Sequence, residues 1–156
     1  MNKVKVVTIG LGYIGLPTSA LIAQNGIQVH GVDINQHVVD TINQGKIHIV
    51  EPSLDLAVEE SVKKGFLKAS TKVVSAETYL IVVPTPFKGN HEPDISYVES
   101  ATRSVLPFLK EDDLFIIEST SPIGTTERMM DFIYKMKPEL KGKLNIAYCP
   151  ERVLPG

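Results

Sequence analysis

The sequence predicts an α/β fold, a doubly wound parallel sheet with a layer of helices on each face. Two observations lead to this fold class. Short runs rich in Val and Ile alternate with longer segments whose ends carry helix-capping residues and glycines. The 156 residues, 43% of them hydrophobic, also suit one domain with a sizeable core. We therefore expect residues 1–156 to form a single three-layer α/β/α domain.

Six strands and five helices are expected in alternation. The expected strands are residues 4–9, 28–32, 67–70, 79–83, 114–118 and 144–148. The expected helices are residues 13–25, 35–45, 53–65, 94–109 and 125–136. Capping side chains open three of these helices and glycines end three, with Asn35, Ser53 and Asp94 at the starts and Gly26, Gly45 and Gly65 at the ends. Right-handed crossovers between parallel strands then give the strand order 3-2-1-4-5-6.

Composition excludes several classes of function. Tryptophan is absent and aromatics make up only 6% of the chain, so the core must be aliphatic. A formal net charge of −2 argues against nucleic acid or an anionic membrane surface as the main partner. Cys149 is the only cysteine, which excludes an internal disulfide, fits a reducing cytoplasm and is expected to be a small buried residue. No apolar stretch has the length of a signal peptide or a transmembrane span.

A glycine-rich turn carries the first chemical signal. Gly10, Gly12 and Gly15 form a G-x-G-x-x-G run between the first expected strand and the first expected helix. The first glycine permits a tight turn, the second lets the backbone approach a pyrophosphate, and the third lets the helix pack close to the strand. The helix N-terminus would then face the phosphates. The alternative is a tight strand-to-helix turn without a ligand.

Asp33 ends the second strand, 23 residues after Gly10. An acid at about this spacing accepts hydrogen bonds from the adenosine ribose in dinucleotide-binding folds. Because a 2′-phosphate would face the same carboxylate, NAD is favoured over NADP as the cofactor. Asp33 is also a suitable helix-capping or turn residue, and the two roles are compatible.

Three polar, proline-stiffened loops follow the last three strands, at residues 84–87, 118–122 and 148–156. The carboxyl ends of parallel strands share one edge of the sheet, and doubly wound folds bind ligands there. Each loop taken singly has ordinary turn chemistry, because Ser, Thr, Pro and Asp are common in turns. Their shared edge favours a ligand-binding rim.

Together these motifs resemble the UDP-glucose and GDP-mannose dehydrogenase superfamily. The resemblance runs along the whole chain and is carried by residues 10–17, 31–35, 49–52, 83–86, 118–120 and 150–156. It implies a Rossmann-type NAD-binding domain whose cofactor contacts are Gly10, Gly12, Tyr13, Ile14, Gly15, Asp33, Thr85 and Thr120. It further implies that full-length members are homodimers, and that a central helix and a UDP-sugar-binding domain lie downstream of this chain.

The ending Pro150-Glu151-Arg152-Val153-Leu154-Pro155-Gly156 is the most selective part of the resemblance. It implies a UDP-N-acetylhexosamine substrate, with the manno form favoured, contacted by Glu151, Arg152 and Val153. Family members oxidise the C6 alcohol to a carboxylate in two NAD-dependent steps through a cysteine. Thr120 and Glu151 match the residues that position water and move protons. The catalytic cysteine belongs to a later segment that Cys149 does not match, so the chain alone is expected to be inactive.

Other readings stay open at this point. One is a non-catalytic dinucleotide sensor, one is an S-adenosylmethionine-dependent methyltransferase with a similar glycine loop, and one is a dehydrogenase of another UDP-hexose. No metal site is expected, because His48 and His91 have no Cys or His partners at ligand spacing. His37 is the only basic side chain close behind Asp33, where many relatives have a basic contact to the adenosine.

Overall fold

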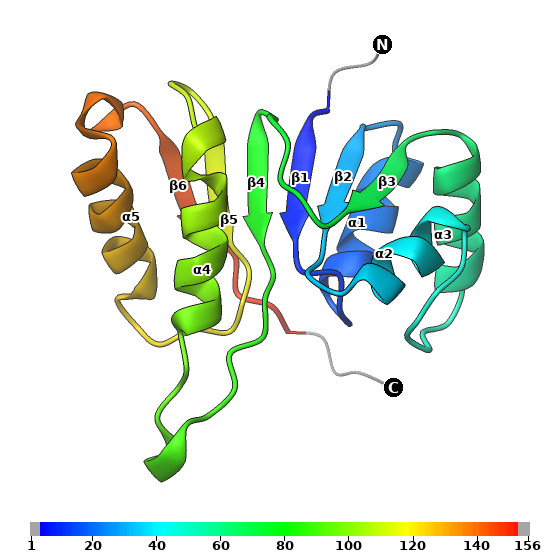
Figure 1. The fold of residues 1–156 in the computed structure, drawn as a ribbon, viewed down its shortest axis with the longest axis horizontal. Coiled ribbons are helices and arrows are strands. Elements are labelled where there is room, and N and C mark those ends of the chain that lie inside the picture. The colour runs from blue at the N-terminus through cyan, green and yellow to red at the C-terminus, as the bar shows by residue number, and fades with distance from the viewer. Residues whose placement is uncertain (1–3, 153–156) are drawn as a thin grey trace.

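In a computed structural model, residues 4–152 of the chain are described, and they form a sheet of six parallel strands. The strand order is β3-β2-β1-β4-β5-β6, as the sequence predicted. The strands are β1 (Val6–Ile9), β2 (Val29–Val32), β3 (Leu67–Ser70), β4 (Thr78–Ile81), β5 (Leu114–Ile117) and β6 (Asn145–Tyr148). Figure 1 shows β1 and β4 pointing toward the same edge, from which the connecting loops leave the sheet.

Helices cover the two faces of the sheet in two groups. Around β1, β2 and β3 lie α1 (Gly15–Gln24), α2 (Gln36–Asn43) and α3 (Leu54–Lys63), and beside β4, β5 and β6 lie α4 (Ser96–Val105) and α5 (Thr125–Met136) (Figure 1). The chain also contains three short 3-10 turns among its described residues: η1 (Gly89–His91) before α4, η2 (Leu106–Phe108) after α4 and η3 (Pro138–Leu140) after α5. The three-layer architecture expected from the sequence is confirmed.

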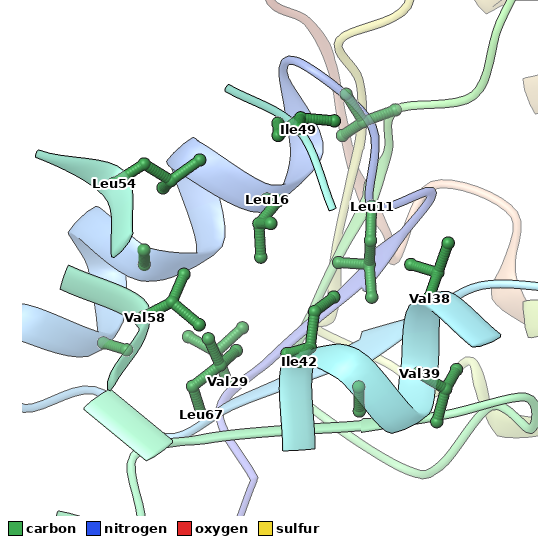
Figure 2. Packing of buried hydrophobic residues seen from close by; sticks show 14 of the residues in the cluster. Leu11, Leu16, Val29, Val38, Val39, Ile42, Ile49, Leu54, Val58 and Leu67 are labelled. Atoms are coloured by element: carbon green, nitrogen blue, oxygen red, sulfur yellow. The ribbon is translucent and has the colours of Figure 1, made fainter. Parts of the chain in front are cut away.

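Each face of the sheet has its own apolar core, because alternate strand residues point to opposite sides. Val6 and Leu80 belong to the cluster under α1, α2 and α3, whereas Val7 and Ile81 belong to the cluster under α4 and α5. Figure 2 shows the first cluster, in which Leu11 from the turn after β1 packs among side chains of α2. Leu11 is fully buried, so the glycine turn is anchored to the core.

Several helix ends were predicted correctly from local signals. The Asn35 side chain accepts a hydrogen bond from the His37 N–H at 3.0 Å and caps α2. Positive φ values at Gly26, Gly45 and Gly65 end α1, α2 and α3, in the left-handed conformation that glycine adopts without strain.

Three local predictions differ from the structure. Ser53 has φ +62° and makes no capping hydrogen bond with its side chain, so backbone geometry rather than a Ser cap starts α3. Asp94 lies one position before the N-cap Ile95, and its carboxylate accepts the N–H of Ser96, the first residue of α4, at 2.9 Å. That helix also stops at Val105, because Pro107 has no N–H to continue it and a 3-10 turn follows.

Cys149, expected to be buried, is exposed. It follows β6, one of the two edge strands, which pairs with β5 alone among the strands of residues 4–152. Its N–H donates to the Ile117 carbonyl at 2.9 Å and so continues the β5 pairing, but side chains along β6 remain largely open to solvent. Whether a residue at a sheet edge is buried depends on which other part of the protein covers that edge. The residues next to Cys149 in the sequence do not reveal this.

Candidate nucleotide-binding site

The three glycines of the first turn have different structural roles. Gly10 has φ +98°, and a Cβ there would overlap the Val82 carbonyl oxygen. A Cβ on Gly15 would overlap the Gly10 carbonyl oxygen. Packing therefore requires both glycines. Gly12 is exposed, and a Cβ there would meet nothing within 4 Å, so nothing in the folded chain explains the missing side chain.

The N-terminus of α1 has the properties of an anion site. Ile14 occupies the N-cap position without a side-chain capping bond, and the first turn contains no acidic residue. Pro17 has no N–H and the Leu16 N–H donates to the Gly12 carbonyl at 3.1 Å, so the remaining N–H groups of this turn and the positive end of the helix dipole have no anion supplied by their own helix. A phosphate group would accept hydrogen bonds from these N–H groups and place its negative charge at the positive end of the dipole.

Asp33 is held in a fixed orientation at the end of β2. Its Oδ2 accepts the Leu11 N–H at 3.0 Å and its Oδ1 accepts the Asn35 N–H at 2.9 Å. Each carboxylate oxygen keeps a second lone pair, so the group can accept two further hydrogen bonds. The hydrogen bond from the Leu11 N–H also joins the Asp33 carboxylate directly to the glycine turn, so the carboxylate is held beside that turn.

A cavity of about 900 Å³ lies along the carboxyl ends of the strands and brings most of the predicted site residues together. Its lining includes Gly10, Gly12, Tyr13, Ile14, Asp33, Thr85, Thr120 and Glu151. Gly15 is buried under the turn and does not line the cavity. Arg152 is exposed outside it, and Val153 lies beyond the described residues.

The loops after β4 and β5 are tied to each other beside this cavity. The Thr85 hydroxyl donates to the Thr120 carbonyl, and the Ser119 Oγ accepts the Val83 N–H at 2.9 Å. Ser119 is 5% exposed and also donates to the Ile81 carbonyl at 3.2 Å. Sequence reasoning missed Ser119 as a positioning residue. Ser119 comes two residues after the buried Ile117 of β5, and strand alternation places both on the same face of the sheet. This spacing is the sequence signal that could have identified Ser119.

Two further titratable groups near the cavity were not expected. Burial, and after it the charge of Glu151, raises the pKa of Glu118, which lines the cavity at the end of β5. His48 was considered only as a metal ligand, but it lies in the electrostatic field of Asp33. Burial lowers the pKa of His48, while the Asp33 charge acts in the opposite direction. In residues 4–152, no three His, Cys, Asp or Glu side chains are grouped as metal ligands.

Residues 4–156 match the family described as "UDP-glucose/GDP-mannose dehydrogenase family, NAD binding domain". The chain belongs to this family. The family match removes the methyltransferase reading and establishes NAD as the cofactor type of the domain. Within the described part of the chain, no helix combines the length and apolar character that a bilayer span requires.

Curated relatives share high sequence identity with this chain. A UDP-N-acetyl-D-mannosamine dehydrogenase from Escherichia coli is 57% identical over all of this chain and 39% of its own length. An NDP-N-acetyl-D-galactosaminuronic acid dehydrogenase from Ralstonia nicotianae is 51% identical over 95% of this chain and 37% of its own length. The chain therefore spans about two fifths of the length of these relatives.

Solved structures of UDP-sugar dehydrogenases also resemble this chain. The UDP-N-acetyl-mannosamine dehydrogenase from Staphylococcus aureus superposes with a TM-score of 0.88 at 43% identity, over 97% of this chain and 38% of that one. The UDP-N-acetyl-mannosamine dehydrogenase from Pyrococcus horikoshii superposes with a TM-score of 0.93 at 39% identity, over 97% of this chain and 37% of that one. A 3-hydroxyisobutyrate dehydrogenase from Mycobacterium tuberculosis, at 16% identity and a TM-score of 0.61, shows the likeness of fold alone.

Proposed function

We propose that this chain is the NAD-binding half of a UDP-N-acetylhexosamine 6-dehydrogenase, an enzyme that oxidises the C6 alcohol of the sugar to a carboxylate. The observation that carries the nucleotide site is Gly12. It is a glycine that packing does not require, beside an uncapped helix N-terminus and an oriented carboxylate. The likeness to UDP-N-acetylmannosamine dehydrogenases supports the sugar class.

Each part of the cavity has a task in this proposal. Gly12 lets the backbone approach the pyrophosphate, and the N-terminal turn of α1, with Tyr13 and Ile14, holds it. Asp33 accepts hydrogen bonds from the adenosine ribose. Thr85 and Thr120, tied together across their two loops, border the nicotinamide end. Bound NAD supplies the hydride acceptor for both oxidations.

The substrate side of the proposal rests on residues after β6. Glu151 lines the cavity and faces the charge of Glu118. In this proposal it takes a proton from the sugar alcohol or from water. Arg152 and Val153 would contact the UDP-sugar. The second oxidation needs a nucleophile that converts the aldehyde into a species able to lose hydride again. The resemblance assigns that nucleophile to a downstream cysteine, and Cys149 has a different sequence context.

We expect no dehydrogenase activity from this chain alone, because removing one member of a catalytic unit costs nearly as much as removing the whole unit. The test measures NADH formation with UDP-N-acetylmannosamine, first with the chain and then after the downstream part of a longer relative is added. NAD binding is measured separately by calorimetry. Turnover by the isolated chain would contradict the proposal, and Cys149→Ser would then test that thiol as the nucleophile.

The sugar stereochemistry is proposed as manno, although a relative named for an N-acetylgalactosamine derivative is nearly as similar. Turnover of the two UDP-N-acetylhexosamines by the complete enzyme would decide between them. We also propose a cytoplasmic location, since a lone, exposed thiol suits a reducing compartment, and a homodimeric complete enzyme. If NAD binds but no added segment restores turnover, a non-catalytic dinucleotide sensor becomes the better description.

A further inference from the structure

Glu118 lies where the glycine turn meets the loop after β5. Its N–H donates to the Ile81 carbonyl at 2.9 Å, which extends the pairing of β4 and β5 by one residue. Ile117 belongs to the core under α4 and α5, whereas Ile116 packs against the core under α1. By strand alternation Glu118 shares the α1 side with Ile116. It therefore projects toward the first turn of α1.

Two cavities meet at this carboxyl group. Glu118 lines the 900 Å³ cavity and also a smaller one of about 360 Å³, and both cavities are lined by Tyr13 and Ile14 as well. These two residues belong to the turn that would hold the pyrophosphate. Asp33 lines only the larger cavity, on the other side of the turn. The two acids thus flank the phosphate position.

One oxygen of the Glu118 carboxyl is unsatisfied in the described part of the chain. Its Oε2 is buried and has no hydrogen-bond partner among the described residues. Burial of an unpaired carboxylate oxygen costs free energy, consistent with the raised pKa of this group. A carboxylate accepts and does not donate, so the missing partner must be a donor. Phosphate oxygens cannot serve, but sugar hydroxyls can.

We propose that Glu118 binds the nicotinamide-side ribose of NAD by accepting hydrogen bonds from its hydroxyls. The inference rests on the proposed function, since it requires NAD in this cavity. In this arrangement Asp33 binds the adenosine ribose, the N-terminus of α1 binds the pyrophosphate, and Glu118 binds the nicotinamide-side ribose. The dinucleotide is then held by one carboxylate at each sugar, and its nicotinamide half is recognised separately from its ADP half.

The test compares three ligands that differ only beyond the pyrophosphate: ADP, ADP-ribose and NAD. Affinities are measured by calorimetry for the 156-residue chain and for Glu118→Leu. Glu118→Leu should bind NAD and ADP-ribose roughly 10-fold or more weakly, as expected when a charged hydrogen bond is lost, and should bind ADP as the unmodified chain does. Asp33→Ala should weaken all three ligands. Glu127→Gln, a change at an exposed acid on α5, should weaken none.

Thermal unfolding without ligand separates this role from a structural one. Because the substitution removes a buried, unpaired carboxyl group, Glu118→Leu should keep or raise the melting temperature while NAD affinity falls. Unchanged NAD affinity in this variant would overturn the inference and leave the NAD site intact. An equal loss for ADP would overturn it as well. Absence of NAD binding to the unmodified chain would instead overturn the proposed function together with this inference.

Discussion

Replacing Gly12 with valine should abolish tight NAD binding and leave the fold intact. A Cβ at this position meets nothing within 4 Å, and Gly12 is not among the residues with positive φ. The folded chain therefore has open space where the side chain begins, at an exposed position. Valine also restricts the unfolded chain more than glycine does, which shifts stability slightly toward the folded state. The melting temperature of the unliganded variant should be equal to or above that of the unmodified chain.

The binding loss follows from the contact that the valine side chain prevents. A backbone N–H bonded to a phosphate oxygen is a charge-assisted hydrogen bond, which contributes about 1.5–3 kcal/mol. Losing one such bond weakens binding roughly 10- to 150-fold, since 1.4 kcal/mol corresponds to a factor of ten. Calorimetric titration with NAD measures this change. Gly12→Ala should lose less, because its side chain extends less far into the cavity.

Gly15→Ala is the matched control in the same turn. Its Cβ would overlap the Gly10 carbonyl oxygen, so this smaller substitution should lower the melting temperature where Gly12→Val does not. Two results would refute the reasoning. Normal NAD affinity in Gly12→Val would show that phosphate does not approach this backbone. Unfolding of Gly12→Val would show that packing, rather than the ligand, requires the glycine.

Three further outcomes are expected from the same structure. Asp33→Ala should cost about 1–3 kcal/mol of NAD affinity and remove the preference for NAD over NADP, whereas equal affinities of the unmodified chain for the two cofactors would contradict the assignment. Burial, and after it the charge of Lys68, lowers the pKa of His30 below its ordinary value of 6.5. Because the unfolded chain then binds the proton more readily, the stability contributed by the neutral ring is complete above pH 6.5 and is lost as the pH falls through the folded-state pKa. Denaturant titrations should therefore show a flatter pH dependence for His30→Gln across this range, and an unchanged slope would contradict the explanation. Finally, Tyr79→Phe should cost about 1–3 kcal/mol of unfolding free energy, because the buried hydroxyl accepts the Ala76 N–H at 2.9 Å, and a loss below about 0.5 kcal/mol in urea titrations would show that this bond is dispensable.

Local patterns were sufficient for the strand order and for most helix ends. Apolar runs separated by helical segments leave few topologies once crossovers are right-handed, and the predicted order is the observed one. The Asn35 cap and the glycines at three helix ends were predictable because a cap satisfies backbone groups within a few residues of itself. Ser53 failed as a cap because its own backbone is left-handed, a conformation that its residue type does not predict.

The sequence by itself determined the fold class, the glycine turn and the spacing to Asp33, because each depends on neighbours close along the chain. Only the tertiary structure decided which of the glycines is required by packing, since the overlapping atoms at Gly10 come from Val82 and Val83, the two residues that follow β4. It also placed Ser119 as the tie between two loops and left a carboxyl oxygen of Glu118 buried without a partner. Both facts depend on which face of β5 each residue occupies and on what the opposite strand and helix present there. Contacts of this kind join residues far apart in the chain, which is why a linear motif does not contain them.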